Sequence, residues 1–408
     1  MKLFKHDYRF FIVFLLIVPA TQCEKSVFDI RQSSAGDILS INSLQVYSTD
    51  EIGRILKSHQ IPDSFTLQYS VEAIAIAYQT TDVQGNNIQA SGALFIPQNA
   101  TNLPLLSIQH GTETKSDRVA SVNPLYSVEG VAGLLTASIG YLTCIPDYPG
   151  YGISFTLHPY HHAESLTNSV VDFLIAARSY CNNGNISLNN QLFITGYSEG
   201  GYVTLALQKE IEENHFQEFD ITAAAPMGGP YDLLGTSNQL LQQSSYPWPA
   251  YIAFLFYAYD DLYGWNRLDE IFNEPYGKTI PSLFDGSKTF AEINRQLPKS
   301  VNSLFAQNFI DDYFTGKEEA LRNALKENTL LDWIPLSPIR FFHGDADDVS
   351  PYQNALTAVD SLKANGAKDI QLTPIPGGTH ATAGLPSVLG AIGWFETFRK
   401  NDPQIAFK

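Results

Sequence analysis

Two patterns of apolar residues alternate along the middle and C-terminal parts of the chain. Short, nearly continuous apolar runs predict buried strands at residues 103–109, 141–145, 191–195, 221–227, 338–342 and 370–375. Longer segments with helical spacing predict helices at residues 131–138, 163–180, 202–213, 352–365 and 385–399. Gly366 directly follows one of these helices, as expected of a helix C-terminus. Strands that alternate with helices predict an α/β fold with a mostly parallel central sheet flanked by helices.

The N-terminal part has a different rhythm. Residues 67–80 and 88–97 are β-rich and flank a turn signal at 84–87, which predicts an antiparallel hairpin. Residues 50–57 predict a short helix capped by Ser48 or Thr49.

The alternation stops between residues 231 and 335. This stretch shows no convincing strand, but it has helix-compatible segments at 251–263, 290–297 and 317–327. We therefore expect a helical cap or lid (231–335) inserted between two parts of one core (24–230 and 336–408). The insertion is rich in aromatic residues, which could line an acyl-chain pocket or form the core of the insertion itself: Tyr246, Trp248, Tyr251, Phe254, Phe256, Tyr257, Tyr259, Tyr263 and Trp265.

Composition and the N-terminus indicate where the protein works. The 408 residues carry a formal net charge of −17, which argues against nucleic acid as an electrostatic partner. Residues 1–20 have a basic start and an apolar run too short for a transmembrane span, which predicts a signal peptide and a secreted or periplasmic protein. A lipid anchor on Cys23 is the alternative. Cys144 and Cys181 could form a disulfide, or Cys144 could be a buried thiol.

One motif joins a predicted strand to a predicted helix. Residues 196–201 read Gly-Tyr-Ser-Glu-Gly-Gly, and Gly-x-Ser-x-Gly in this context is the nucleophile elbow. Such a turn is too sharp for bulky neighbours, and it presents the hydroxyl of Ser198 near a helix N-terminus, where developing negative charge is favoured. The other possibility is an ordinary glycine-rich turn.

A serine nucleophile needs a base and an orienting acid, in the chain order Ser, acid, His. Asp345, Asp347 and Asp348 follow the predicted strand at 338–342, and His380 follows the strand at 370–375. The carboxyl ends of parallel strands meet at one sheet edge, so these residues should lie near Ser198. We expect Asp347 to be the acid and His380 the base, with Asp345 and Asp348 capping the turn.

A tetrahedral intermediate also needs hydrogen-bond donors for its oxyanion. We expect one donor to be the backbone N–H of Glu199 and the other to be Thr112, with Gly111 or Glu113 as alternatives. The side chain of Glu199 is expected to be solvated. The run His158-Pro159-Tyr160-His161-His162 suggests a metal site, but the spacing matches no known closed ligand set, and we expect a loop near the substrate cleft instead.

The chain resembles the α/β-hydrolase superfamily and, more narrowly, the secretory lipase family, over about residues 35–400. The shared motifs are Gln109-His110-Gly111-Thr112, Asp147-Tyr148-Pro149-Gly150-Tyr151-Gly152, the 196–201 elbow, Asp332-Trp333-Ile334-Pro335, the 343–351 turn and Gly378-Thr379-His380. The resemblance implies hydrolysis of carboxylic esters beneath a helical cap, with Ser198, Asp347 and His380 as the triad.

The sequence therefore predicts a secreted serine lipase or esterase that acts through an acyl-enzyme and needs no cofactor. Its expected partner is a small-molecule or lipid ester. Two other hypotheses are a serine peptidase of the prolyl-oligopeptidase kind and a catalytically silent binding module. The first usually carries a β-propeller, of which no repeat is found here, and the second typically lacks a triad member.

Overall fold

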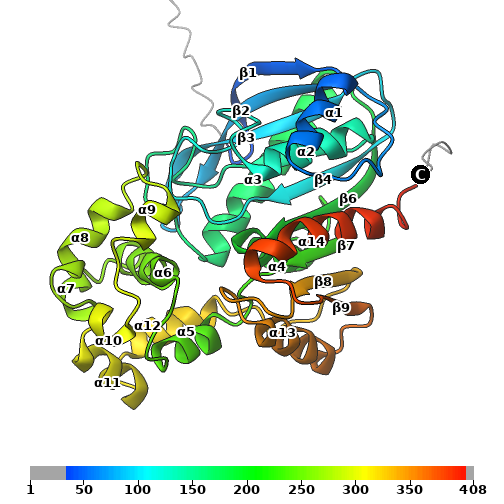
Figure 1. Ribbon diagram of the computed structural model, residues 1–408. Coiled ribbons are helices and arrows are strands. Elements are labelled where there is room, and N and C mark those ends of the chain that lie inside the picture. Colours follow the sequence, from blue (N-terminus) through cyan, green and yellow to red (C-terminus); the bar gives the residue numbers. More distant parts are fainter. Residues whose placement is uncertain (1–33, 401–408) are drawn as a thin grey trace, which may run out of the picture. The chain divides into compact units, whose positions relative to one another are not determined.

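The computed structural model describes residues 34–400 and contains one nine-stranded sheet in the order β1-β2-β3-β5-β4-β6-β7-β8-β9 (Figure 1). Its strands are β1 (Ile38–Tyr47), β2 (Val71–Thr81), β3 (Asn87–Pro97), β4 (Leu103–Gln109), β5 (Leu142–Pro146), β6 (Leu188–Tyr197), β7 (Ile221–Met227), β8 (Ile339–Gly344) and β9 (Ile370–Ile375). The predicted signal peptide (1–20) and Cys23 lie outside the described residues.

The sheet has a parallel part and an antiparallel part. The strands from β5 to β9 along the sheet run parallel to one another, and β5 pairs antiparallel with β3 on its other side. β2 and β3 pair antiparallel along their whole length, from Val71 opposite Pro97 to Thr81 opposite Asn87, which confirms the predicted hairpin. The mostly parallel sheet of the predicted fold class is therefore confirmed.

The edge strand β1 was missed by the sequence analysis. It pairs antiparallel with β2, but Leu39, Ile41 and Val46 are exposed, so the strand shows little of the burial that makes a strand recognisable in sequence. Its backbone pairing with β2, a long-range contact, gives it its structure.

Two sets of helices cover the two faces of the sheet, and adjacent residues of β6 show this division. Phe193 packs with α1 (Thr49–Ser58), α2 (Val128–Ser138) and α14 (His380–Phe395). Leu192 and Ile194 pack on the other face with α3 (Ala163–Asn183), α4 (Glu199–Asn214) and α13 (Tyr352–Asn365). Successive strand residues point to opposite faces, so the two apolar clusters lie on opposite sides of one sheet.

Two predicted helix ends are found in the structure, and one helix begins earlier than predicted. Ser48 caps α1 in a capping box with Glu51, and Gly366 ends α13 with φ 118°. The closing helix α14, however, begins at His380 rather than at residue 385. Thr379 caps it, and the glycines before Thr379 had suggested that the loop continues further.

All elements between β7 and β8 are helices, grouped to one side of the sheet (Figure 1). They are α5 (Leu233–Leu241), α6 (Pro249–Leu262), α7 (Leu268–Ile271), α8 (Tyr276–Leu283), α9 (Phe290–Asn294), α10 (Val301–Leu304), α11 (Gln307–Thr315) and α12 (Glu319–Glu327). Most of the aromatic side chains of α6 form the core of this insertion. Phe254 stacks on Phe284, and Phe256 packs edge-on against Phe305.

Two open questions from the sequence concern cysteines and membrane spans. Cys144 and Cys181 are both free and buried, so they form no disulfide in this structure. Within residues 34–400, none of the helices combines the length and apolar character that crossing a membrane requires.

Candidate active site

Ser198 lies at the sharp turn between β6 and α4, with φ 61° and ψ −121°. This backbone conformation is strained for a residue with a side chain, and the surrounding structure must hold it in place. The glycines of the motif are required by close backbone approach. A Cβ atom at Gly200 would collide with the carbonyl oxygen of Gln109, and one at Gly201 with that of Met227. The N–H of Ser198 donates to the Met227 carbonyl at 2.9 Å.

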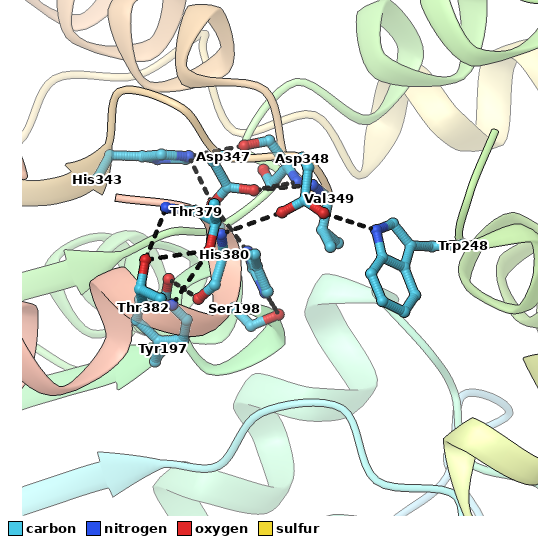
Figure 2. A network of polar contacts seen from close by, with 12 residues as sticks. Tyr197, Ser198, Trp248, His343, Asp347, Asp348, Val349, Thr379, His380 and Thr382 are labelled. Carbon is cyan, nitrogen blue, oxygen red and sulfur yellow. Dashed lines mark hydrogen bonds and ion pairs between the residues drawn. The ribbon is translucent and has the colours of Figure 1, made fainter. Parts of the chain in front are cut away.

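The structure brings Ser198, Asp347 and His380 together (Figure 2). His380 Nε2 lies 2.9 Å from Ser198 Oγ, and His380 Nδ1 lies 2.8 Å from Asp347 Oδ2. A carboxylate can only accept hydrogen bonds, so Nδ1 carries a proton and donates it. Nε2 of the neutral ring is then free to accept the serine hydroxyl.

Each of the three residues is held by a different part of the fold. Asp347 lies in the turn between β8 and α13, and His380 is the first residue of α14. Tyr197, next to the serine, donates its hydroxyl to the carbonyl oxygen of His380 at 2.6 Å. The end of β6 is thereby connected directly to the start of α14.

The side chain of Asp347 is fully buried and is surrounded by hydrogen-bond donors. Its Oδ1 accepts the N–H groups of Val349 and Ser350 at 2.9 and 2.8 Å. His343 Nε2 lies 3.4 Å from its Oδ2, a contact that the sequence analysis missed. Burial raises the pKa of the Asp347 carboxyl, but hydrogen bonds and charge from His343 and His380 outweigh it and leave the pKa well below its usual range.

The neighbouring aspartates hold loops instead of the imidazole ring. Asp345 Oδ1 accepts the N–H of Gly377 at 2.7 Å. Asp348 accepts the indole N–H of Trp248 at 3.1 Å and the backbone N–H of His380 at 3.3 Å (Figure 2). Asp348 therefore connects the inserted helices to the turn that carries Asp347.

The two predicted oxyanion donors flank Ser198. The N–H of Glu199 is one of the first N–H groups of α4, which have no acceptor within the helix. Thr112 follows β4 and lines the same cavity as Ser198, with its hydroxyl 3.0 Å from that of Tyr160. The N–H of Gly111 instead donates to Glu129 Oε1 at 3.0 Å, which favours Thr112 over Gly111 as the second donor.

The expectation of a solvated Glu199 side chain was wrong. Only 1% of the residue is exposed, and its Oε1 lies 2.6 Å from His158 Nε2. Burial raises the pKa of the Glu199 carboxyl, but the charge of His158 and its hydrogen bond outweigh this effect, so the pKa lies below its ordinary value. The other ring nitrogen of His158 lies 2.9 Å from the Pro149 carbonyl oxygen, so the ring faces an acceptor on both sides. No local signal revealed this pair, because 41 residues separate its members.

The other histidines of the 158–162 run have separate roles. His162 caps α3 by accepting the N–H of Ser165 at 3.3 Å. His161 is buried, and its Nδ1 has no partner within the described residues. Burial lowers the pKa of each of these two rings to about 4. Residues 34–400 contain no group of three or more His, Cys, Asp or Glu side chains arranged to hold a metal ion.

Comparison with known structures defines the class. The sheet and its helices are those of an α/β-hydrolase. A putative hydrolase from Legionella pneumophila is 26% identical, with a TM-score of 0.82 over 90% of this chain and 99% of that one. The ligand-bound rice cell wall degrading esterase LipA from Xanthomonas oryzae is 27% identical, with a TM-score of 0.80 over 90% of this chain and 100% of that one.

The family follows from the sequence match. Residues 126–406 match the secretory lipase family, and the chain belongs to that family. A lipase A from Moesziomyces aphidis is 20% identical over 379 residues, which cover 86% of this chain and 78% of that protein. The resemblance inferred from the sequence motifs is thus confirmed, and the chain is a member of a family of lipases and esterases.

Proposed function

We propose that this chain is a secreted serine hydrolase of carboxylic esters, with Ser198, His380 and Asp347 as its triad. The observation that carries the proposal is the continuous hydrogen-bond chain from Ser198 Oγ through His380 to Asp347, with distances of 2.9 and 2.8 Å. Membership of the secretory lipase family supports both the ester substrate and secretion.

The contacts support a two-step mechanism. Ser198 Oγ attacks the ester carbonyl while its proton passes to His380 Nε2. The tetrahedral intermediate collapses as its C–O bond to the alcohol breaks, and His380 gives the proton to the leaving alcohol. A water molecule then attacks the acyl-enzyme, again losing its proton to His380, and the acid is released as the Ser198 hydroxyl is restored. Asp347 holds the ring in the required tautomer and stabilises the imidazolium.

The backbone N–H groups of Glu199 and Thr112 act as oxyanion donors in this proposal. Glu199 directly follows Ser198 at the β6–α4 turn, and Thr112 lies in the loop that follows β4, which are the two positions from which α/β-hydrolases donate to an oxyanion. Glu129 supports the second one by fixing Gly111, the residue before Thr112. Loss of an oxyanion donor costs about 10²–10³-fold in kcat in a serine hydrolase.

Residues 231–335 act as a cap in the same proposal. Tyr251 of α6 lines the cavity that borders Ser198, and the indole N–H of Trp248 donates a hydrogen bond to Asp348, next to Asp347. The insertion therefore covers the site from one side.

Replacement of the nucleophile is the direct test. Ser198→Ala should lower kcat for p-nitrophenyl acetate by at least about 10⁴-fold, because no other group can form the acyl-enzyme. A fluorophosphonate should label the wild-type protein on the peptide that contains Ser198. Ser40→Ala changes an exposed serine of β1 and is the matched control, which should retain full activity. Full activity in the Ser198→Ala variant would refute the proposal.

A further inference from the structure

Two cavities of very different size meet at Ser198. The larger has a volume of about 580 Å³ and is bordered by both Ser198 and His380. The smaller, about 50 Å³, lies on the side of the inserted helices and has room for only a few water molecules. Ligand pockets in proteins typically enclose about 300–1,000 Å³, so only the first has the size of a substrate site.

The larger cavity arises from how helices cover one face of the sheet. α2 packs over β5 and β3, whereas α14 packs over β6, β7 and β8. The strand order places β4 between these two groups, where neither helix fully covers the sheet. We call the resulting space the α2–α14 cavity.

Its walls are mainly apolar. Side chains from the two helices and from the sheet line it: Val131, Ala132, Leu135, Val388, Leu389, Ile392, Leu106 and Ile108. The buried polar groups along these walls already have partners. Thr195 donates to the Ala225 carbonyl at 2.8 Å, and Thr136 donates to the Ala132 carbonyl at 2.9 Å. Among the described residues, none of the buried polar atoms without a partner belongs to the lining of this cavity. Such a space favours a hydrocarbon chain over a polar ligand.

The insertion borders a third cavity of about 370 Å³, together with residues between 150 and 158, but neither Ser198 nor His380 borders that cavity. Beside Ser198 the insertion leaves far less space. Its small pocket is bordered by Tyr160, Tyr246, Tyr251 and Leu255, and its larger rings are packed against one another. Tyr251 is the one residue of the insertion that borders the α2–α14 cavity. The insertion therefore contacts the reacting centre without providing room for a long chain next to Ser198.

We propose that the α2–α14 cavity binds the acyl chain of the substrate, so that α2 and α14, and not the inserted helices, set the acyl-length preference. The proposal rests on the proposed function, because it places the acyl group on Ser198. It predicts an ester substrate whose acyl part is an unbranched hydrocarbon chain and whose alcohol part lies outside the cavity. Tyr126, Val128 and Leu385, which are exposed and apolar, border the cavity on its solvent side.

Filling the cavity from either wall provides the test. Ala132 of α2 and Val388 of α14 are only partly buried and line the cavity, so a larger side chain can extend into it. Ala132→Phe and Val388→Phe should each lower kcat/KM for p-nitrophenyl octanoate by at least about tenfold while that for p-nitrophenyl acetate changes little. Loss of the contacts of even one methylene group in an apolar pocket lowers kcat/KM by about tenfold or more.

Ile252→Phe is the matched control, because Ile252 is also β-branched and borders the small pocket on the insertion side. The control should leave the octanoate-to-acetate ratio unchanged. A changed ratio in Ile252→Phe together with an unchanged ratio in both cavity variants would overturn the proposal. Wild-type protein that hydrolyses neither ester would instead refute the proposed function, so the two failures are distinguishable.

A structural readout covers the case in which the variants do not fold. Wild-type protein inactivated with p-nitrophenyl octylphosphonate carries an eight-carbon chain on Ser198, and its crystal structure shows where that chain lies. Density between Leu135 and Ile392 is the expected result. Density that runs among the helices of the insertion would overturn the proposal.

Discussion

The two sides of Ser198 are built in opposite ways. On the side of the insertion, aromatic rings fill the space next to the serine, and the cavity that borders Ser198 there has a volume of only about 50 Å³. On the other side, α2 and α14 leave about 580 Å³ over the sheet. Rings on the filled side contribute to stability, because replacing a packed ring by a small side chain removes buried apolar area and leaves a cavity. Side chains around the cavity can change size at less cost, and they are therefore the ones that can determine which substrate fits.

Removal of a ring from the filled side should have the largest effect on stability. Phe256 is completely buried and packs edge-on against Phe305 and Phe309. Phe256→Ala should reduce the free energy of unfolding by about 3–5 kcal/mol, as measured by urea denaturation. Phe155→Ala removes a ring that is 98% exposed and should change stability by less than about 0.5 kcal/mol. A loss in Phe256→Ala no larger than that of the control would contradict the packed description of the insertion.

Acid should lower the stability of the protein through His161, which borders the small cavity on the insertion side of Ser198. The pKa of His161 is about 4 in the folded protein and 6.5 ordinarily, so between these values the unfolded state binds more protons. Stability should therefore fall as the pH drops from about 6.5 to about 4, by up to about 1.4 kcal/mol per pH unit for this group.

His161→Leu should reduce that slope, because leucine binds no proton in either state, while His162, whose pKa is also lowered to about 4, still contributes. Urea denaturation at several pH values measures the slope. His59→Leu changes an exposed histidine and is the control, for which the slope should remain. An unchanged slope in His161→Leu would mean that the acid sensitivity arises elsewhere.

The contact between the insertion and the triad turn should have the smallest effect. Trp248→Phe removes the hydrogen bond to Asp348 but keeps an aromatic ring. A single bond of this kind contributes about 1 kcal/mol or less, so stability and kcat/KM for p-nitrophenyl acetate should change only slightly. Trp265→Phe, which changes an indole stacked on Tyr263 away from the triad turn, is the control. A drop in kcat of more than about tenfold, worth about 1.4 kcal/mol, would show that the insertion acts on the triad through Asp348.

Local patterns were enough to predict much of the fold. The limits of β7 match the apolar run at residues 221–227, and Gly366 ends α13 as its position suggested. These features depend on neighbouring residues, which a sequence displays directly. β1 depends on pairing with β2 and was missed, because its exposed side chains leave no periodic pattern.

The site shows the same limit. The order and strand-end positions of Ser198, Asp347 and His380 indicated that they would meet, and the structure brings them within hydrogen-bond distance. The burial of Glu199 against His158 could not be foreseen, because glutamate side chains are usually solvated and the partner of this one is distant in sequence. The α2–α14 cavity is likewise a gap between elements, and no residue pattern encodes a gap.

One helix carries both the proposed base and a wall of the cavity. α14 begins at His380, and its residues as far as Phe395 line the cavity. At 1.5 Å per residue, this wall extends about 22 Å along the helix from His380. Pro386 lies within it and has no N–H to donate to the preceding turn, so the helix has a weak point between the base and the deeper wall. An acyl chain bound in the cavity would therefore contact the same helix that positions the proposed base.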